Sequence, residues 1–298
     1  MFRIRRLLAH IIATLTIKKQ RSNYMKSLIK YGVFKKLKEK RDFRKSAPMP
    51  KKFKYNLGVC AIMKNEGPYL REWIEFHKMM GVDKFFLYDN ESTDNTKKIL
   101  QPYIKSGLVE YNWFPGQKMQ LPAYYDCVSR HKLDTKWLAI FDLDEYIVPV
   151  KHKTIKEFLK TVKPDVAQII IDWVIFGSNG HEKRPNGLVL ESYTMRARHN
   201  WLYKSIINPR LAMGLNCHEH DVAGKTIEPS IKIIRMHHYH CKSWAEYVLK
   251  RSRGDAWNGN AAGDKKYQRA CFDEHDKNEV FDGSALRFVP KLKRILNR

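Results

Sequence analysis

The sequence predicts an α/β protein with a mainly parallel sheet flanked by helices. Short apolar runs alternate with amphipathic helical stretches from Asn56 onward, a pattern typical of repeated strand–helix units. The apolar runs are continuous, as in strands buried on both faces. Polar clusters follow three of the runs. Because parallel strands joined by right-handed crossovers end at one edge of a sheet, we expect these clusters to meet there.

Three strand–helix units are predicted before an acidic motif. The predicted strands span residues 57–63, 84–88 and 109–114. The helix after the first strand begins at Pro68, which suits a first helical turn, and ends at Gly81. The next helix carries the apolar residues of 99–104 and ends at Gly107, and the third helix spans residues 121–134.

The fourth predicted strand ends in acidic residues. Residues 137–141 form an apolar run, and Asp142, Asp144 and Glu145 follow it. Burying two carboxylates at the end of a core strand is costly unless a positive charge compensates them. A divalent cation does so, and oxygen ligands of this kind suit Mg²⁺ or Mn²⁺. We therefore predict a metal site at Asp142 and Asp144, the alternative being a surface turn with solvated acids.

The net charge of +25 is concentrated at the two ends of the chain. Residues 1–55 carry 18 basic and 2 acidic residues, and residues 284–298 carry 5 basic residues and no acid, which leaves +4 for residues 56–283. These boundaries predict a basic amphipathic arm and tether, a globular domain and a basic amphipathic tail. The five cysteines have no C-x-x-C spacing and an odd count, which favours a reducing cytoplasm over a disulfide framework.

Both basic ends contain amphipathic helical patterns. The apolar positions are Ile4, Leu8, Ile11 and Leu15 at the start, and Phe288, Leu292 and Ile295 at the finish. The apolar stretch 7–17 is too short to span a bilayer, and residues 35–54, with two prolines, are typical of a tether. We therefore predict peripheral attachment to an anionic membrane surface. The alternative is an N-terminal helix that packs on the domain.

Four stretches carry a family resemblance. They are VCAIMKNEGPYLREWIEFHKMMGVDKFFLYDNESTDNT (59–96), FDLDEYIVP (141–149), WVIFGSNGH (173–181) and HHYHCKSWAEYVLKRSRGDA (237–256). Together they resemble glycosyltransferase family 92 and the related family 2-like glycosyltransferases. The resemblance implies a GT-A fold, a nucleotide-sugar donor, a divalent metal and inversion at the anomeric carbon. It also implies that Asp89 holds the nucleoside, that Asp142 and Asp144 form the D-x-D pair, and that a later histidine completes the metal site.

The remaining site residues keep alternatives open. For the later histidine we favour His238, because His238-Tyr239 and Lys242-Ser243 match the family pattern, and His218 is the rival; the additional His237 leaves the register ambiguous. The polar and cationic residues expected at the nucleotide sugar are Lys64, Asn65, Glu66, Asp89, Asp142, Lys204, Lys250 and Arg253. An inverting transfer needs a general base, for which the candidates are His181, Glu182 and Asp172.

The resemblance implies an inverting, metal-dependent glycosyltransferase, and the basic amphipathic ends predict that it is bound peripherally to the inner, cytoplasmic face of a membrane. The donor is expected to be a UDP-hexose, with galactose or glucose favoured by the resemblance. The acceptor is expected to be a surface glycan or glycolipid in polysaccharide or lipopolysaccharide biosynthesis, and the cofactor Mn²⁺ or Mg²⁺. One alternative is a catalytically silent GT-A-like glycan-binding or scaffold protein. Another is a polyanion-binding protein acting through its basic arms, although the near-neutral middle disfavours nucleic acid as the partner.

Overall fold

The computed structural model describes residues 33–199, 202–254, 256 and 269–297. The chain divides into two units, residues 1–46 and 47–298. In the first unit, helix α3 spans Val33–Ser46. The first part of the predicted tether, residues 35–46, is therefore helical, because Lys, Arg, Leu and Glu are good helix formers and the prolines come only at positions 48 and 50. The helix predicted around residues 4–15 lies outside the described residues.

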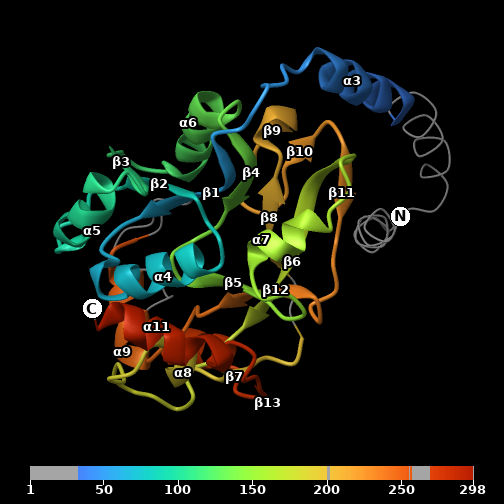
Figure 1. Cartoon of the computed structure of the whole chain (residues 1–298). Helices are drawn as coiled ribbons and strands as arrows, with labels where there is room; N and C mark the ends of the chain where they lie inside the picture. The colour runs from blue at the N-terminus through green and yellow to red at the C-terminus, as the bar shows by residue number, and fades with distance from the viewer. Residues whose placement is uncertain (1–32, 200–201, 255, 257–268, 298) are drawn as a thin grey trace, which may run out of the picture. The chain divides into compact units, whose positions relative to one another are not determined.

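The second unit is built on a large sheet (Figure 1). Within the described residues it has nine strands, and eight of them follow the order β3-β2-β1-β4-β8-β6-β12-β5, with β11 pairing beside β6. Strands β3, β2, β1 and β4 pair in parallel. Strand β8 runs antiparallel between β4 and β6, and β12 pairs in parallel with β6 and antiparallel with β5. The structure thus confirms the predicted mainly parallel α/β sheet.

The strands of this sheet have the following bounds: β1 Tyr55–Met63, β2 Lys84–Asp89, β3 Val109–Trp113, β4 Thr135–Ile140, β5 Glu145–Pro149, β6 Val166–Ile175, β8 Tyr203–Ile207, β11 Lys225–Ile227 and β12 Ile234–His238. Two small antiparallel pairs are formed by β9 (Ala212–Gly214) with β10 (Asp221–Val222) and by β7 (Met195–Arg196) with β13 (Val280–Phe281).

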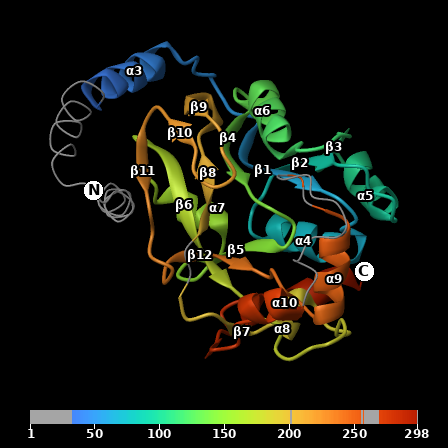
Figure 2. The ribbon, with the colours of Figure 1, turned by 180° about the vertical axis from the view of Figure 1, so that it is seen from behind.

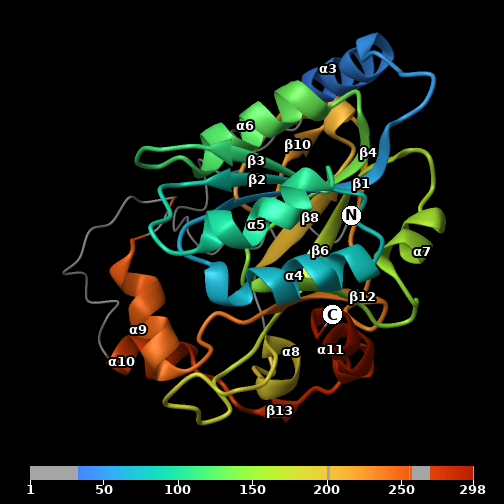
Figure 3. The ribbon, with the colours of Figure 1, turned by 60° about the vertical axis from the view of Figure 1, so that its left-hand side comes forward.

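Helices cover both faces of the parallel strands (Figure 3). Helices α4 (Gly67–Met79) and α5 (Thr96–Lys105) lie on one face, and α6 (Gln120–His131) lies on the other. Gly81 and Gly107 follow α4 and α5 with positive φ angles of 96° and 75°, as predicted for helix ends. The remaining helical elements are α7 Ile155–Lys160, α8 Val189–Ser192, α9 Trp244–Ser252, α10 Arg269–His275 and α11 Val289–Leu296, with short 3₁₀ turns at Pro209–Leu211 and Leu286–Phe288. Figure 2 shows α9 and α10 from behind.

The C-terminal helix α11 belongs to the core of the domain. Phe288 and Leu292 are buried among core residues, and the rings of Phe76 and Phe288 meet edge to face with centroids 5.6 Å apart. The prediction that this apolar face meets lipid is therefore wrong for Phe288 and Leu292, because α4 covers it. In the part of the chain that the structure describes, no helix is both long and apolar enough to cross a membrane.

Candidate active site

A cavity of about 700 Å³ opens at the carboxyl ends of β1 and β4. The strand order changes direction at this point, since the chain runs from β1 to β2 and β3 on one side and then to β4 on the other. Such switch points are where open α/β sheets bind ligands. The cavity is lined by members of all three predicted polar clusters, among them Lys64, Glu66, Glu91, Asp142 and Asp144. The predicted convergence of these clusters is thereby confirmed.

Asp142 is held at the cavity wall by a buried lysine. Its Oδ2 accepts a hydrogen bond of 2.8 Å from Lys204 Nζ, and its side chain remains 33% exposed. Burial lowers the pKa of Lys204, but the interaction with Asp142 outweighs it, and the pKa is raised well above its ordinary value. Lys204 is therefore a permanent cation beneath the cavity. It pairs with Asp142 and supplies a positive charge beside this carboxylate from within the protein.

Glu145 is more deeply buried than Asp142. It is fully buried, and its Oε2 accepts a 2.7 Å hydrogen bond from the Asp142 backbone N–H. Burial raises the pKa of Glu145 well above its ordinary value, although Lys204 partly offsets the effect. Burial thus favours the neutral form of Glu145, and its hydrogen bond positions the loop that carries Asp142.

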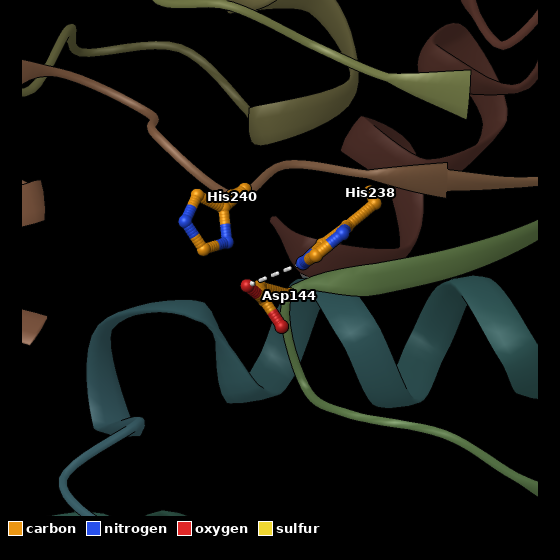
Figure 4. Close-up of side chains that lie close together, drawn as sticks. All are labelled: Asp144, His238 and His240. Carbon is orange, nitrogen blue, oxygen red and sulfur yellow. Dashed lines mark hydrogen bonds and ion pairs between the residues drawn. The ribbon is translucent and has the colours of Figure 1, made fainter. Parts of the chain in front are cut away.

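Asp144 faces two histidines (Figure 4). Its Oδ2 lies 3.2 Å from His238 Nε2 and also pairs with the ammonium of Lys250. Asp144, His238 and His240 each offer a donor atom, and these atoms lie within 4.8 Å of one another. Burial would raise the pKa of Asp144, but the positive charge of Lys250 and the contact with His238 hold it well below its ordinary value. The carboxylate is therefore ionised.

The donor set of this cluster fits a divalent transition metal. Burial, followed by the charge of Lys250, lowers the pKa of His240 well below its ordinary value, and burial also lowers that of His238. Both imidazoles are neutral at pH 7, which is the form that binds metal. One carboxylate with two imidazoles suits Mn²⁺ better than Mg²⁺, because Mg²⁺ prefers oxygen ligands alone. Asp144, His238 and His240 would hold such an ion.

The candidate metal cluster differs from the predicted ligand set in two respects. His240, which the sequence analysis passed over, belongs to the cluster, while Asp142 and His218 line the cavity outside it. His218 Nδ1 instead lies 2.9 Å from the backbone oxygen of Tyr203. The missed signal is the period of two in an extended chain, which places His238 and His240 on the same side.

The intervening His237 confirms this alternation. It is fully buried, its Nδ1 lies 3.0 Å from the Tyr239 hydroxyl, and its Nε2 lies 3.2 Å from the Ser284 hydroxyl. Burial lowers the pKa of His237 to about 3. The histidine that left the register ambiguous is therefore a neutral core residue.

The predicted donor-binding residues divide into two groups. Lys64, Glu66, Lys204, Lys250 and Arg253 line the cavity. Asn65 does not, because it shapes the loop: it has a positive φ of 54°, and its Oδ1 accepts from the Thr93 backbone N–H at 2.7 Å.

Asp89 also serves its loop rather than the cavity. It is 1% exposed, and its two oxygens accept hydrogen bonds of 2.8 Å from the Ser92 backbone N–H and the Tyr111 hydroxyl. The next two residues, Asn90 and Glu91, line the cavity in its place. The geometry therefore supports a turn-forming role for Asp89 and not the nucleoside contact that the resemblance implies.

The three candidate bases are not among the residues that line this cavity. His181 and Glu182 accept backbone hydrogen bonds at the first turn of α9, whereas the last turn of that helix lines the cavity. Asp172 neighbours the cavity-lining Trp173 on β6, so alternation along the strand points it to the opposite face of the sheet. The carboxylates that do line the cavity are Glu66, Glu91, Asp142 and Asp144.

Comparisons with solved structures give only distant likenesses. The Staphylococcus aureus TarS fragment 1–349, solved in complex with UDP, aligns with a TM-score of 0.35 and 14% identity over 52% of this chain and 47% of that one. The mannosyltransferase PcManGT from Pyrobaculum calidifontis, solved with GDP-Man and Mn²⁺, aligns with a TM-score of 0.31 and 14% identity over 48% of this chain and 44% of that one.

Comparisons with known sequences identify the family. A rice (Oryza sativa subsp. japonica) glycosyltransferase family 92 protein is 29% identical over 198 residues, which cover 65% of this chain and 31% of the relative. The Caenorhabditis elegans beta-1,4-galactosyltransferase galt-1 is 24% identical over 231 residues, covering 69% of this chain and 54% of the relative. This chain therefore spans about a third of the rice protein and about half of the nematode one. The family model matches residues 55–278, most of the chain, and the chain belongs to glycosyltransferase family 92.

Proposed function

We propose that the protein is a metal-dependent glycosyltransferase that transfers a hexose from a UDP-sugar with inversion. The observation that carries the proposal is the cluster of Asp144, His238 and His240 in a cavity that also contains several cations. A divalent cation held there would offset the negative charge that develops on the departing diphosphate. The family membership supports the same reaction class.

The residues around the cluster suit a nucleotide sugar. Lys64, Lys250 and Arg253 bring positive charge to the cavity, and such groups bind phosphate oxygens. Asp142 is partly exposed beside Lys204, so its carboxylate oxygens can accept hydrogen bonds from ribose hydroxyls. We favour UDP-galactose as the donor, because the relatives include proteins named galactan beta-1,4-galactosyltransferase and beta-1,4-galactosyltransferase. We propose a glycan or glycolipid as the acceptor.

The proposal is tested by offering the purified protein a panel of nucleotide sugars with Mn²⁺. We expect UDP release that is fastest with UDP-galactose and is abolished by excess EDTA. Lys291→Met, at an exposed position of α11, provides the control that keeps activity. If no nucleotide sugar binds or turns over, the protein is instead a catalytically silent family member.

We also propose that the first unit attaches the enzyme to an anionic lipid surface at the inner face of a membrane. Within α3, seven basic residues accompany two acidic ones, and each basic residue near such a surface contributes about 1 kcal/mol. Deleting residues 1–46 should abolish sedimentation with anionic vesicles while UDP release continues. Equal sedimentation of the full chain with neutral and anionic vesicles would contradict this attachment.

A further inference from the structure

The last turn of α9 contacts three residues of the candidate donor site. The contacts join Lys250 to Asp144, Arg251 to His240, and Arg253 to Glu66. In the second of these, the Arg251 guanidinium donates to His240 Nε2 at 2.7 Å. A single helix end therefore supplies cations to two members of the candidate metal cluster and to a neighbouring acid at the cavity wall.

The contact of Lys250 is the most informative, because it uses the carboxylate of the candidate metal cluster. Lys250 Nζ pairs with Asp144 Oδ2, the same oxygen that lies 3.2 Å from His238 Nε2. The Asp144 side chain is 5% exposed, so few other groups can reach this oxygen. An ammonium and a divalent cation cannot share one carboxylate oxygen at close range without strong repulsion.

We propose that Lys250 occupies the place of the divalent cation in the metal-free site and moves to the donor diphosphate when the metal binds. This inference rests on the proposed function. Binding of the metal separates Lys250 from Asp144, and the released ammonium then has a new anionic partner in the diphosphate. Lys250 is 26% exposed and its side chain is long and flexible. Its ammonium group can therefore move between Asp144 and the diphosphate without movement of α9.

The exchange makes metal and nucleotide binding mutually dependent. Mn²⁺ alone must displace Lys250, and UDP alone must draw Lys250 away from Asp144. When both bind, Mn²⁺ replaces Lys250 at Asp144, and the diphosphate replaces Asp144 as the partner of Lys250. Coupling of this kind is reciprocal, and it commonly changes affinities by about 5- to 150-fold.

Mn²⁺ binding without nucleotide tests the exchange directly, with calorimetry as the readout. In Lys250→Met we expect Mn²⁺ to bind at least about fivefold more tightly than in the wild type, and the enhancement of Mn²⁺ affinity by UDP to shrink by a similar factor. Arg253→Met removes a nearby charge that pairs with Glu66 instead. Its smaller change in Mn²⁺ affinity measures the general effect of charge, and Lys291→Met should change nothing.

Amine labelling followed by mass spectrometry gives a second readout on the wild-type chain. Mn²⁺ alone should raise the acetylation rate of Lys250, since it releases the amine from Asp144, and added UDP should lower the rate again. Labelling of Lys291 serves as the internal reference.

The outcomes separate this inference from the proposed function. If Mn²⁺ and UDP both bind to the wild type, but Lys250→Met leaves Mn²⁺ affinity unchanged or Mn²⁺ leaves Lys250 labelling unchanged, the exchange is wrong and the metal site stands. If Mn²⁺ binds neither to the wild type nor to Lys250→Met, the proposed metal dependence fails together with the exchange.

Discussion

The two halves of the central sheet contribute different members of the carboxylate–cation pairs in the cavity. The parallel half supplies acids at the ends of its strands, with Glu66 after β1 and Asp142 and Asp144 after β4. The mixed half and the helix after it supply basic side chains, which are Lys204 from β8, His238 from β12 and Lys250 from α9. Asp142 and Asp144 each find their cation across this seam.

The difference shows why the acids need not repel one another in the metal-free protein. Lys204 is buried between Asp142 and Glu145, so its ammonium group stays in place beside these carboxyl groups. Lys250 is partly exposed and ends a surface helix, so it can be exchanged. Lys204 therefore acts as a structural cation, whereas another cation can replace Lys250 at Asp144. The following predictions test this comparison, from the largest expected effect to the smallest.

Asp144→Asn should reduce sugar transfer by roughly 100-fold or more, because it removes the carboxylate of the metal cluster. Stability should fall rather than rise, since the substitution breaks the contacts with Lys250 and His238. Turnover assays and calorimetric titration with Mn²⁺ measure the first effect, and urea unfolding measures the second. Full turnover in this variant would contradict the metal mechanism.

His240→Ala and His218→Ala form a matched pair within the same cavity. Loss of a cluster ligand should weaken Mn²⁺ binding by at least about 10- to 100-fold, the range found even for residues that only support ligands. His218 lies outside the cluster, so His218→Ala should change Mn²⁺ affinity far less. Calorimetry decides the assignment, and the reverse order of effects would restore His218 as the ligand.

Lys204→Met should lower the free energy of unfolding by about 3 kcal/mol, the lower end of the range for breaking a buried ion pair, because Asp142 remains partly exposed. Urea denaturation measures this loss. Lys291→Met is the control and should stay within about 0.5 kcal/mol of the wild type. A change as small as that of the control would show that Lys204 is not needed as the structural cation.

Glu145→Gln should remove a pH dependence from the stability. The folded protein raises the pKa of Glu145, so above the ordinary value of about 4.5 the folded state keeps a proton that the unfolded state releases. The wild type should therefore lose stability relative to the variant as pH rises from 5 to 8, by up to about 1.4 kcal/mol per pH unit. Urea unfolding at pH 5, 6.5 and 8 measures the difference, and parallel curves would mean that Glu145 is ionised in the fold.

Asp89→Ala should have the smallest effect on ligand binding. Both of its oxygens serve the loop, so we expect UDP affinity to change by less than threefold, or about 0.6 kcal/mol, while the protein becomes less stable. Calorimetry with UDP and thermal unfolding make the two measurements. A loss of 1.5–3 kcal/mol in UDP binding with unchanged stability, the size of a hydrogen bond to a charged group, would return Asp89 to the nucleoside.

The N-terminal half of the domain was largely predictable from local patterns. Apolar runs, Pro68, Gly81 and Gly107 mark its strands and helix ends, and the acids after residue 141 mark the cavity. These signals are local, because helix ends and strand burial depend on neighbouring residues. The family membership was likewise visible in the four motif stretches.

The metal ligands and the fate of the C-terminal helix depended on contacts distant in sequence. His238 meets Asp144 because β12 pairs antiparallel with β5, where His238 lies opposite Glu145. Side-chain alternation also places His240 beside His238. It predicts a position at the cavity only when the strand pairing is known, because the pairing fixes which face of the strand meets the cavity. Likewise, the amphipathic pattern of α11 defines an apolar face but not its partner. The sequence determined the four parallel strands β1 to β4, their polar ends and the family. The tertiary structure decided which distant groups meet, since strand pairing and helix packing join residues that no local pattern connects.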